Sequence, residues 1–152
     1  MPIDKAADYT FTLTYDAGAQ QLLAHWRGSV PEANLYAHYA ELMALAEAHG
    51  NCRFWLLNVG ERNWHTPGFR HWFANEFVGL LHAAMQQPVF MAYVVSAAQA
   101  ELVKTPVIQA VEHNSAQHDV YPFFFGSEAA ARDWLAHQQA HDEASRRPRP
   151  AR

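Results

Sequence analysis

The sequence predicts an α/β fold made of a single domain, in which helices pack on a mixed β-sheet. Two stretches near the start alternate between apolar and polar residues, which is the pattern of strands with one buried face. Two later stretches, residues 52–58 and 89–95, are apolar at nearly every position, as in the strands of a covered parallel sheet. Helical periodicities separate the later strands, so the predicted element order is ββαβαβαβα.

Composition and charge restrict the class of protein. The chain has 152 residues, of which 50% are hydrophobic and 17% are charged, and this suits one folded domain. The formal net charge of −4 offers no general attraction to phosphate backbones, so we expect no nucleic-acid partner. Cys52 is the only cysteine, which excludes an internal disulfide and a multi-cysteine metal site. Without a signal pattern or a membrane-length apolar run, we expect a cytoplasmic protein and no membrane insertion.

The first elements are predicted to be a hairpin and a helix. Aromatic residues and Leu13 alternate with threonines over residues 9–15, and apolar residues alternate over residues 21–27. A turn at Asp16-Ala17-Gly18 separates the two strands, so they should form an antiparallel pair. Ser29 and Glu32 have the spacing of a capping box, which predicts that Ser29 caps a helix ending at Gly50.

The central stretch predicts a strand, a loop and a second helix. Residues 52–58 form the strand and residues 59–65 the loop. Thr66 is placed to cap the helix, and Pro67 fits its first turn. The predicted apolar stripe of this helix consists of Phe69, Phe73, Phe77, Leu80 and Ala84.

The last part of the chain predicts two further strands and more helix. Residues 89–95 are predicted to form a strand, and residues 96–100 begin an irregular helical segment. A second helical segment is predicted to begin at Thr105 and to end at about His113, before a polar loop over residues 114–119. Pro122 predicts that the strand over residues 120–125 lies at a sheet edge. Ser127 caps the final helix. The predicted domain spans residues 1–141, and residues 142–152 are predicted to be a disordered tail, so truncation at Ala140 should change little.

This order of elements resembles the STAS domain of anti-sigma factor antagonists and its SEC14-like relatives. The likeness covers residues 9–138 and depends on residues 52–58, 89–96, 123–127 and 134–135. It implies a non-enzymatic regulatory or protein-interaction module. The antagonists carry an Asp-Ser-Ser-Gly-type motif whose serine is phosphorylated by a partner kinase. Here His65-Thr66-Pro67-Gly68 stands in its place, and Pro67 falls at the serine, so the phospho-switch is absent there.

Candidate functional residues gather in the loop before the second helix. They are Gly60, Glu61, Arg62, Asn63, His65, Thr66, Pro67 and Gly68. Three functions remain open: a regulatory interaction surface, a SEC14-like binder of a small apolar ligand or lipid, and an enzyme that uses this loop.

We predict no cofactor and no metal. The ten histidines are scattered along the chain, and His137 and His141 lack the glutamate of a zinc-protease motif. His113 and His118 flank a loop that is equally plausible as a solvated connection.

The abundant aromatic residues raise the question of what covers the second face of the sheet. In the STAS fold the helices lie chiefly on one face, so apolar residues on the other need a cover. Candidates for that surface are Trp26, Trp55, Tyr93 and Phe124. We expect a homodimer to bury them, and an apolar ligand would do the same; alternatively, residues 96–104 and those flanking Val30 fold over this face.

Overall fold

One mixed five-stranded sheet organises the chain. The computed structural model describes residues 9–63 and 67–146. The strands are β1 (Tyr9–Asp16), β2 (Gln21–Gly28), β3 (Phe54–Arg62), β4 (Val89–Val94) and β5 (Val120–Phe125). They lie in the order β1-β2-β3-β4-β5, with β1 antiparallel to β2 and the later pairs parallel. The predicted α/β class, the opening hairpin and the edge position of β5 are confirmed.

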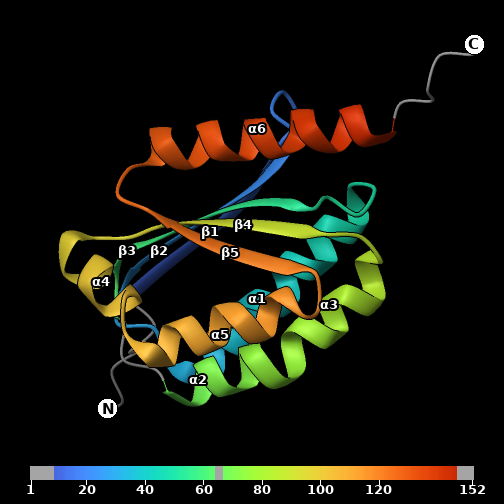
Figure 1. Ribbon diagram of the computed structural model, residues 1–152. Coiled ribbons are helices and arrows are strands. Elements are labelled where there is room, and N and C mark those ends of the chain that lie inside the picture. The colour runs from blue at the N-terminus through green and yellow to red at the C-terminus, as the bar shows by residue number, and fades with distance from the viewer. Residues whose placement is uncertain (1–8, 64–66, 147–152) are drawn as a thin grey trace, which may run out of the picture.

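The helices occupy both faces of this sheet unequally. They are α1 (Glu32–Ala48), α2 (Pro67–Trp72), the π-helical η2 (Phe73–Phe77), α3 (Val78–Met85), α4 (Ala97–Val103), α5 (Pro106–Ala116) and α6 (Glu128–Arg146). Figure 1 shows α1, α2, α3 and α5 on one face and α6 alone on the other. Because the parallel strands follow one another in sequence order, their helical crossovers all return over the same face.

The main core lies between the sheet and the group of helices. Trp26, Trp55 and Tyr93 are all buried there, and Phe124 packs against the same cluster. The expectation that these four residues form a surface on the second face is therefore wrong. Alternation along a strand shows which residues share a face, but it does not show which face the helices cover. These residues consequently supply no reason for a homodimer.

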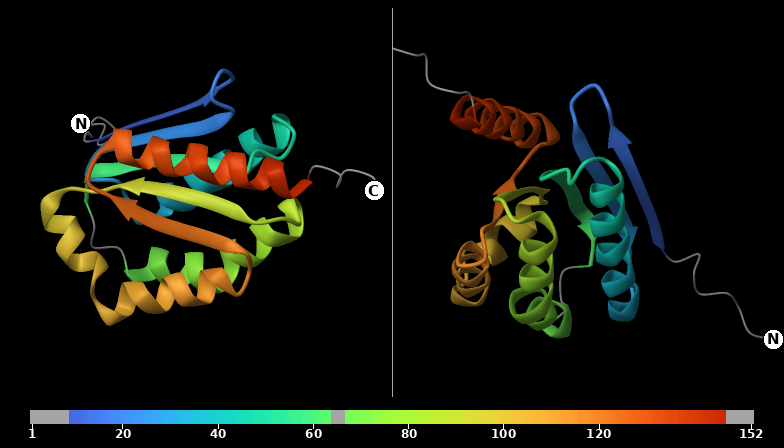
Figure 2. Two further views of the ribbon diagram at one scale, coloured as in Figure 1. Left: turned by 45° about the horizontal axis from the view of Figure 1, so that its top comes forward. Right: turned by 90° about the vertical axis from the view of Figure 1, so that its right-hand side faces the viewer.

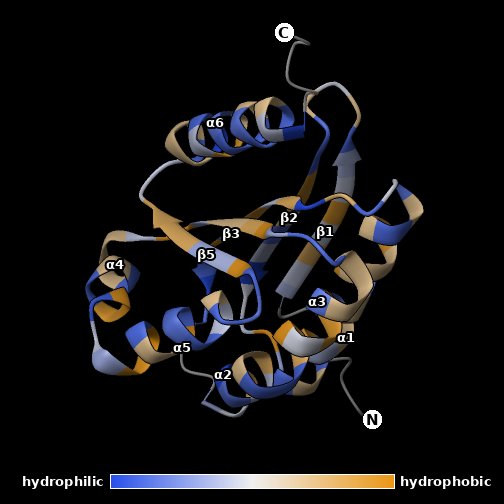
Figure 3. Ribbon diagram, turned by 45° about the vertical axis from the view of Figure 1, so that its right-hand side comes forward, coloured by the Kyte–Doolittle hydropathy of each residue, from blue (hydrophilic) through white to orange (hydrophobic). Residues whose placement is uncertain are grey.

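A second, smaller core lies under α6. It consists of Phe54, Leu56, Ala92, Val94, Ala131 and Leu135. The cover of this face is thus the last helix of the chain, and not residues 96–104 as one alternative expected. In Figure 3, β3 is apolar along most of its length, whereas α6 alternates between polar and apolar residues, as a helix with one buried side must.

The β1–β2 hairpin extends past the cover that α6 provides. Figure 2 shows the hairpin beside α6 with no helix over its outer face. Thr10, Thr12 and Thr14 of β1 are exposed on that face, while Phe11 and Leu13 between them pack against the main core. The outer face of the hairpin can be left to solvent because its side chains are polar.

The π-helical turn η2 changes which residues of the second helix are buried. Leu80, predicted to lie in the apolar stripe, is 57% exposed, whereas Leu81 and Met85 are buried. A π-turn contains one residue more than an α-turn, so each residue after η2 is shifted by one position around the helix. The stripe therefore continues through Leu81 instead of Leu80.

The first helix is not capped as predicted. Pro31 occupies the N-cap position of α1 without a side-chain hydrogen bond, and Ser29 is exposed. Glu32 instead accepts a hydrogen bond from the backbone N–H of Phe69 at 2.8 Å, which caps α2. A Cβ atom at Gly68 would lie 2.6 Å from the Glu32 carboxylate, so glycine leaves room for this tertiary cap.

Three predicted boundaries also differ. β3 continues to Arg62, through part of the predicted loop 59–65, and α5 continues to Ala116. The predicted cap of α6 is confirmed, since Ser127 Oγ accepts from the N–H of Ala130 at 3.2 Å. However, α6 continues through Arg146, so the predicted start of a disordered tail at residue 142 is wrong; residues 147–152 lie outside the described part of the chain.

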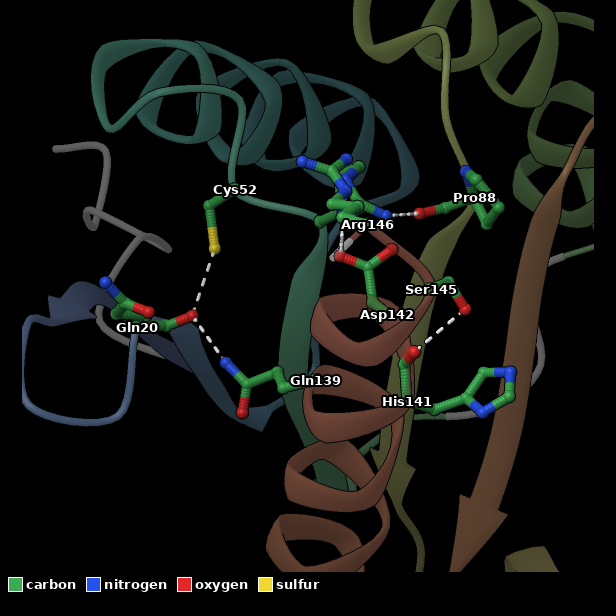
Figure 4. A network of polar contacts seen from close by, with 9 residues as sticks. Gln20, Cys52, Pro88, Gln139, His141, Asp142, Ser145 and Arg146 are labelled. Carbon is green, nitrogen blue, oxygen red and sulfur yellow. Dashed lines mark hydrogen bonds and ion pairs between the residues drawn. The ribbon is translucent and has the colours of Figure 1, made fainter. Parts of the chain in front are cut away.

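Polar contacts attach the last turns of α6 to the start of the sheet. Arg53, which directly precedes β3, pairs with Asp142 at 2.6 Å and donates to the carbonyl of Pro88 at 2.8 Å. Gln139 donates to the carbonyls of Ala19 and Gln20 in the β1–β2 turn. Figure 4 shows that these contacts converge on one end of the helix. They connect α6 to two separate strand ends.

Candidate functional site

The predicted functional loop is divided between the two faces of the sheet. Because β3 extends to Arg62, Glu61 and Arg62 point to opposite faces. Glu61 lies on the outer face, where it pairs with Arg27 at 2.7 Å and with His25 at 3.3 Å. Arg62 points toward the helices and is buried. The two side chains therefore belong to different environments.

The remaining loop residues have structural positions where they are described. Asn63 accepts from the N–H of Val30 at 2.9 Å and donates to its carbonyl, which fixes the end of β3 to the segment before α1. Gly60 lies in β3 beside the start of α4. Pro67 and Gly68 begin α2, whereas His65 and Thr66 lie outside the described residues. The predicted Thr66 cap is therefore not tested.

Arg62 contributes to a pocket on the helix-covered face, which we call the α2–α5 pocket. Its walls are mostly apolar and come from α2, η2, α5 and β5: Phe69, Phe73, Ile108, Val111, Pro122 and Phe124. Arg62, Arg70 and Tyr93 complete it, and its volume is about 60 Å³. Asn114 of α5 donates a hydrogen bond to the carbonyl of Ala74 in η2, which holds the two walls together.

Two tyrosines meet beside this pocket. The hydroxyl groups of Tyr39 and Tyr93 lie 2.7 Å apart within the core. Burial raises the pKa of Tyr39 above its ordinary value of 10.0, although the Arg62 guanidinium opposes this rise. Burial also raises the pKa of Tyr93 well above 10.0, and the neighbouring Tyr39 adds to the effect. Both hydroxyls are therefore uncharged near neutral pH.

The Arg62 guanidinium lies among aromatic rings. Its central carbon is 5.2 Å from the ring centre of Trp26 and 5.8 Å from that of Phe69. The residue is only 7% exposed, and its Nη1 has no hydrogen-bond partner among the described residues. Nε of Arg70, across the pocket, also lacks a partner within this part of the chain.

A separate polar cluster under β1 was not predicted. The indole N–H of Trp26 donates to Nδ1 of His38 at 2.9 Å, so the neutral ring carries its proton on Nε2. That nitrogen lies 3.4 Å from the Tyr9 hydroxyl, which also accepts from Asn34 at 2.6 Å. Burial lowers the pKa of His38 below 6.5; the Glu41 carboxylate opposes this shift, and the charge of Arg62 adds to it. This cluster satisfies buried polar groups, and none of its four residues lines the α2–α5 pocket.

Cys52 and the histidines within the described ranges do not form a reactive centre. Burial raises the pKa of the Cys52 thiol, whose Sγ donates to the carbonyl of Gln20 at 3.5 Å, so the thiol stays protonated. Across residues 9–63 and 67–146, no three His, Cys, Asp or Glu side chains lie close enough to hold a metal ion. None of the helices in these ranges is long and apolar enough to span a membrane.

Comparisons of the chain with protein-family models, curated proteins and solved structures produced no match. The resemblance to STAS domains therefore stays a prediction.

Sequence reasoning found Arg62 but missed the residues that surround it. Tyr39 and Tyr93 come from α1 and β4, and no local pattern indicates that their hydroxyls meet. Arg70 could have been identified as a candidate site residue from the sequence, because it is a charged residue between the apolar positions Phe69 and Phe73.

Proposed function

We propose that this chain binds a small, largely apolar ligand in the α2–α5 pocket. The observation that supports the proposal most directly is the pocket itself, which has apolar walls and a few inward polar groups. Small-molecule sites in proteins commonly have this composition. Its lining includes residues near the carboxyl ends of β3, β4 and β5, which is where ligands bind in open α/β sheets. This favours the SEC14-like alternative over an enzyme, for which no described pair of groups supplies a mechanism.

Two substitutions on α5 test this function with a matched control. Val111 lines the pocket, whereas Val107, one turn earlier, is 55% exposed and lies outside it. Val111→Phe should fill the pocket, and Val107→Phe should leave it open. We expect small apolar compounds to shift backbone amide resonances around Ile108 in the wild type and in Val107→Phe, and to cause no such shift in Val111→Phe.

The opposite pattern would contradict the proposal. If a panel of alkyl and aryl compounds at millimolar concentration shifts no resonance near Ile108, the pocket is not a binding site. Equal binding to the wild type and to Val111→Phe would place the ligand elsewhere. Native mass spectrometry of mildly extracted protein adds a second readout, because a retained ligand appears as added mass that Val111→Phe should lack.

A regulatory interaction surface is the second proposal. It is supported by the outer face of the β1–β2 hairpin, where Glu61, Arg27 and His25 form an exposed charged group beside uncovered threonines. Glu61→Arg should abolish capture of a protein partner, whereas Glu47→Arg on the exposed side of α1 should not. A partner retained equally by both variants would exclude this surface. The predicted homodimer is tested by light scattering, where a monomer at micromolar concentration would contradict it.

A further inference from the structure

Arg62 carries a permanent positive charge into the interior of the protein. A guanidinium group stays protonated at every accessible pH. Burying such a charge costs several kcal/mol unless an opposite charge and hydrogen bonds compensate it. Arg62 is 7% exposed, so most of that cost applies.

No described carboxylate balances this charge, although Nε of Arg62 donates a hydrogen bond to the carbonyl of Asn63 at 3.3 Å. Neither Arg62 nor Arg70 forms an ion pair within residues 9–63 and 67–146. The nearby hydroxyls of Tyr39 and Tyr93 cannot do so, because burial raises the pKa of both and keeps them neutral. The rings of Trp26 and Phe69 offset part of the cost through cation–π contact, but they leave Nη1 without an acceptor.

A second guanidinium faces the same space. Arg70 also lines the α2–α5 pocket, and its Nε likewise has no acceptor among the described residues. Two unpaired arginine donors beside one cavity form the arrangement that binds a carboxylate, because a guanidinium donates two parallel hydrogen bonds to such a group. The remaining walls are apolar and suit a hydrocarbon body.

We propose that the α2–α5 pocket binds a small alkyl or aryl monocarboxylate, with Arg62 and Arg70 holding its carboxylate and the apolar walls holding its body. This inference rests on the proposed function and names its ligand class. The pocket volume of about 60 Å³ limits the enclosed part to a few carbon atoms, so the outer part of a phenyl ring or of a longer alkyl chain lies at the open side of the pocket. A multiply charged anion such as phosphate would lose more hydration than two arginines and apolar walls replace.

The test compares isosteric ligands of different charge. Benzoate and hexanoate are titrated into the wild type alongside benzamide and hexanamide, with inorganic phosphate as a further probe. Binding is followed by calorimetry and by amide resonances near Ile108. We expect the carboxylates to bind at least about tenfold more tightly than the amides, because charge-assisted hydrogen bonds are stronger than neutral ones.

Arginine variants assign the effect to the proposed groups. Arg62→Met should weaken benzoate binding about tenfold or more while leaving benzamide binding unchanged. Arg27→Met, on the opposite face of the sheet, should bind benzoate like the wild type. Without ligand, Arg62→Met should melt at the wild-type temperature or above it, because the substitution removes an uncompensated buried charge. If Arg62→Met does not fold, Arg70→Met provides the same comparison.

Each other outcome contradicts a specific statement. Equal binding of carboxylates and amides would overturn the carboxylate inference and leave the proposed apolar-ligand function intact. Preferential binding of phosphate would replace the ligand class. A much lower melting temperature of ligand-free Arg62→Met, with benzoate binding unchanged in Arg70→Met, would assign Arg62 a structural role. No binding by any compound would contradict both proposals.

Discussion

Removing the carboxylate of Asp142 should destabilise the protein measurably. Asp142 is the counter-charge of Arg53, whose side chain is 7% exposed, and the two lie 2.6 Å apart. Breaking a fully buried ion pair costs about 3–5 kcal/mol. Asp142 itself is 22% exposed, and Arg53 keeps its hydrogen bond to Pro88, so water and that carbonyl compensate part of the loss. We therefore expect Asp142→Ala to lower the free energy of unfolding by about 1.5–3 kcal/mol.

Thermal and urea unfolding measure this loss. For a chain of this size the change corresponds to a melting temperature lower by about 3–12 °C. Asp133→Ala, at an exposed position on the same helix, is the matched control and should have little effect. The double variant Arg53→Met/Asp142→Ala should recover part of the stability, because it removes both charges together.

Equal unfolding of Asp142→Ala and Asp133→Ala would contradict a stabilising Arg53–Asp142 pair, and so would a double variant that loses as much stability as the two single variants combined. The same logic revises the expectation for truncation. Shortening the chain at Ala140 removes Asp142 and should destabilise the protein by a similar amount.

Three other perturbations have defined outcomes. In urea unfolding, Leu81→Ala should lower the free energy of unfolding by about 2–5 kcal/mol and Leu80→Ala by less than about 0.5 kcal/mol, because η2 places only Leu81 in the core. Equal losses would contradict the shifted apolar stripe. Glu32→Ala should lower the free energy of unfolding by about 0.5–2 kcal/mol through loss of the α2 cap, whereas Ser29→Ala should leave it nearly unchanged. A larger loss in Ser29→Ala than in Glu32→Ala would instead support the capping box predicted from the sequence. His38 has a folded-state pKa below its unfolded value of 6.5, so its contribution is complete above pH 6.5 and is lost as the pH falls through the folded-state pKa. His38→Gln should show a shallower decline of stability below pH 6.5 than the wild type, and parallel curves would exclude this residue as the cause.

The order of elements was predictable because each depends on local chemistry. The alternation over residues 9–15, the proline at the start of α2 and the Ser127 cap act within a few residues of their own positions. The layer arrangement was not predictable in this way. Nothing within α6 indicates that its apolar side covers the face of the sheet opposite the other helices, since that depends on which face the earlier crossovers already occupy.

The shifted apolar stripe had no local signal either. Phe69, Phe73 and Phe77 are spaced by four residues, and the 3.6-residue period of an α-helix then requires a step of three, which predicts Leu80 as the next buried position. The extra residue of η2 allows the four-residue spacing to continue, so Leu81 replaces Leu80 in the core. The shift therefore becomes visible only when the π-helical turn is seen in the folded chain.

The candidate site depends on a similar tertiary effect. Polar residues after Asn58 predicted a loop, but Arg27 and Gly28 of β2 pair with Glu61 and Arg62 and extend β3 past its apolar part. In a loop, neighbouring acidic and basic side chains could approach one another. In a strand they point to opposite faces, so Glu61 pairs with Arg27 at the surface while Arg62 enters the core without an acidic neighbour from its own strand. The extension of β3 therefore separates the two charges, and this separation leaves the α2–α5 pocket positively charged.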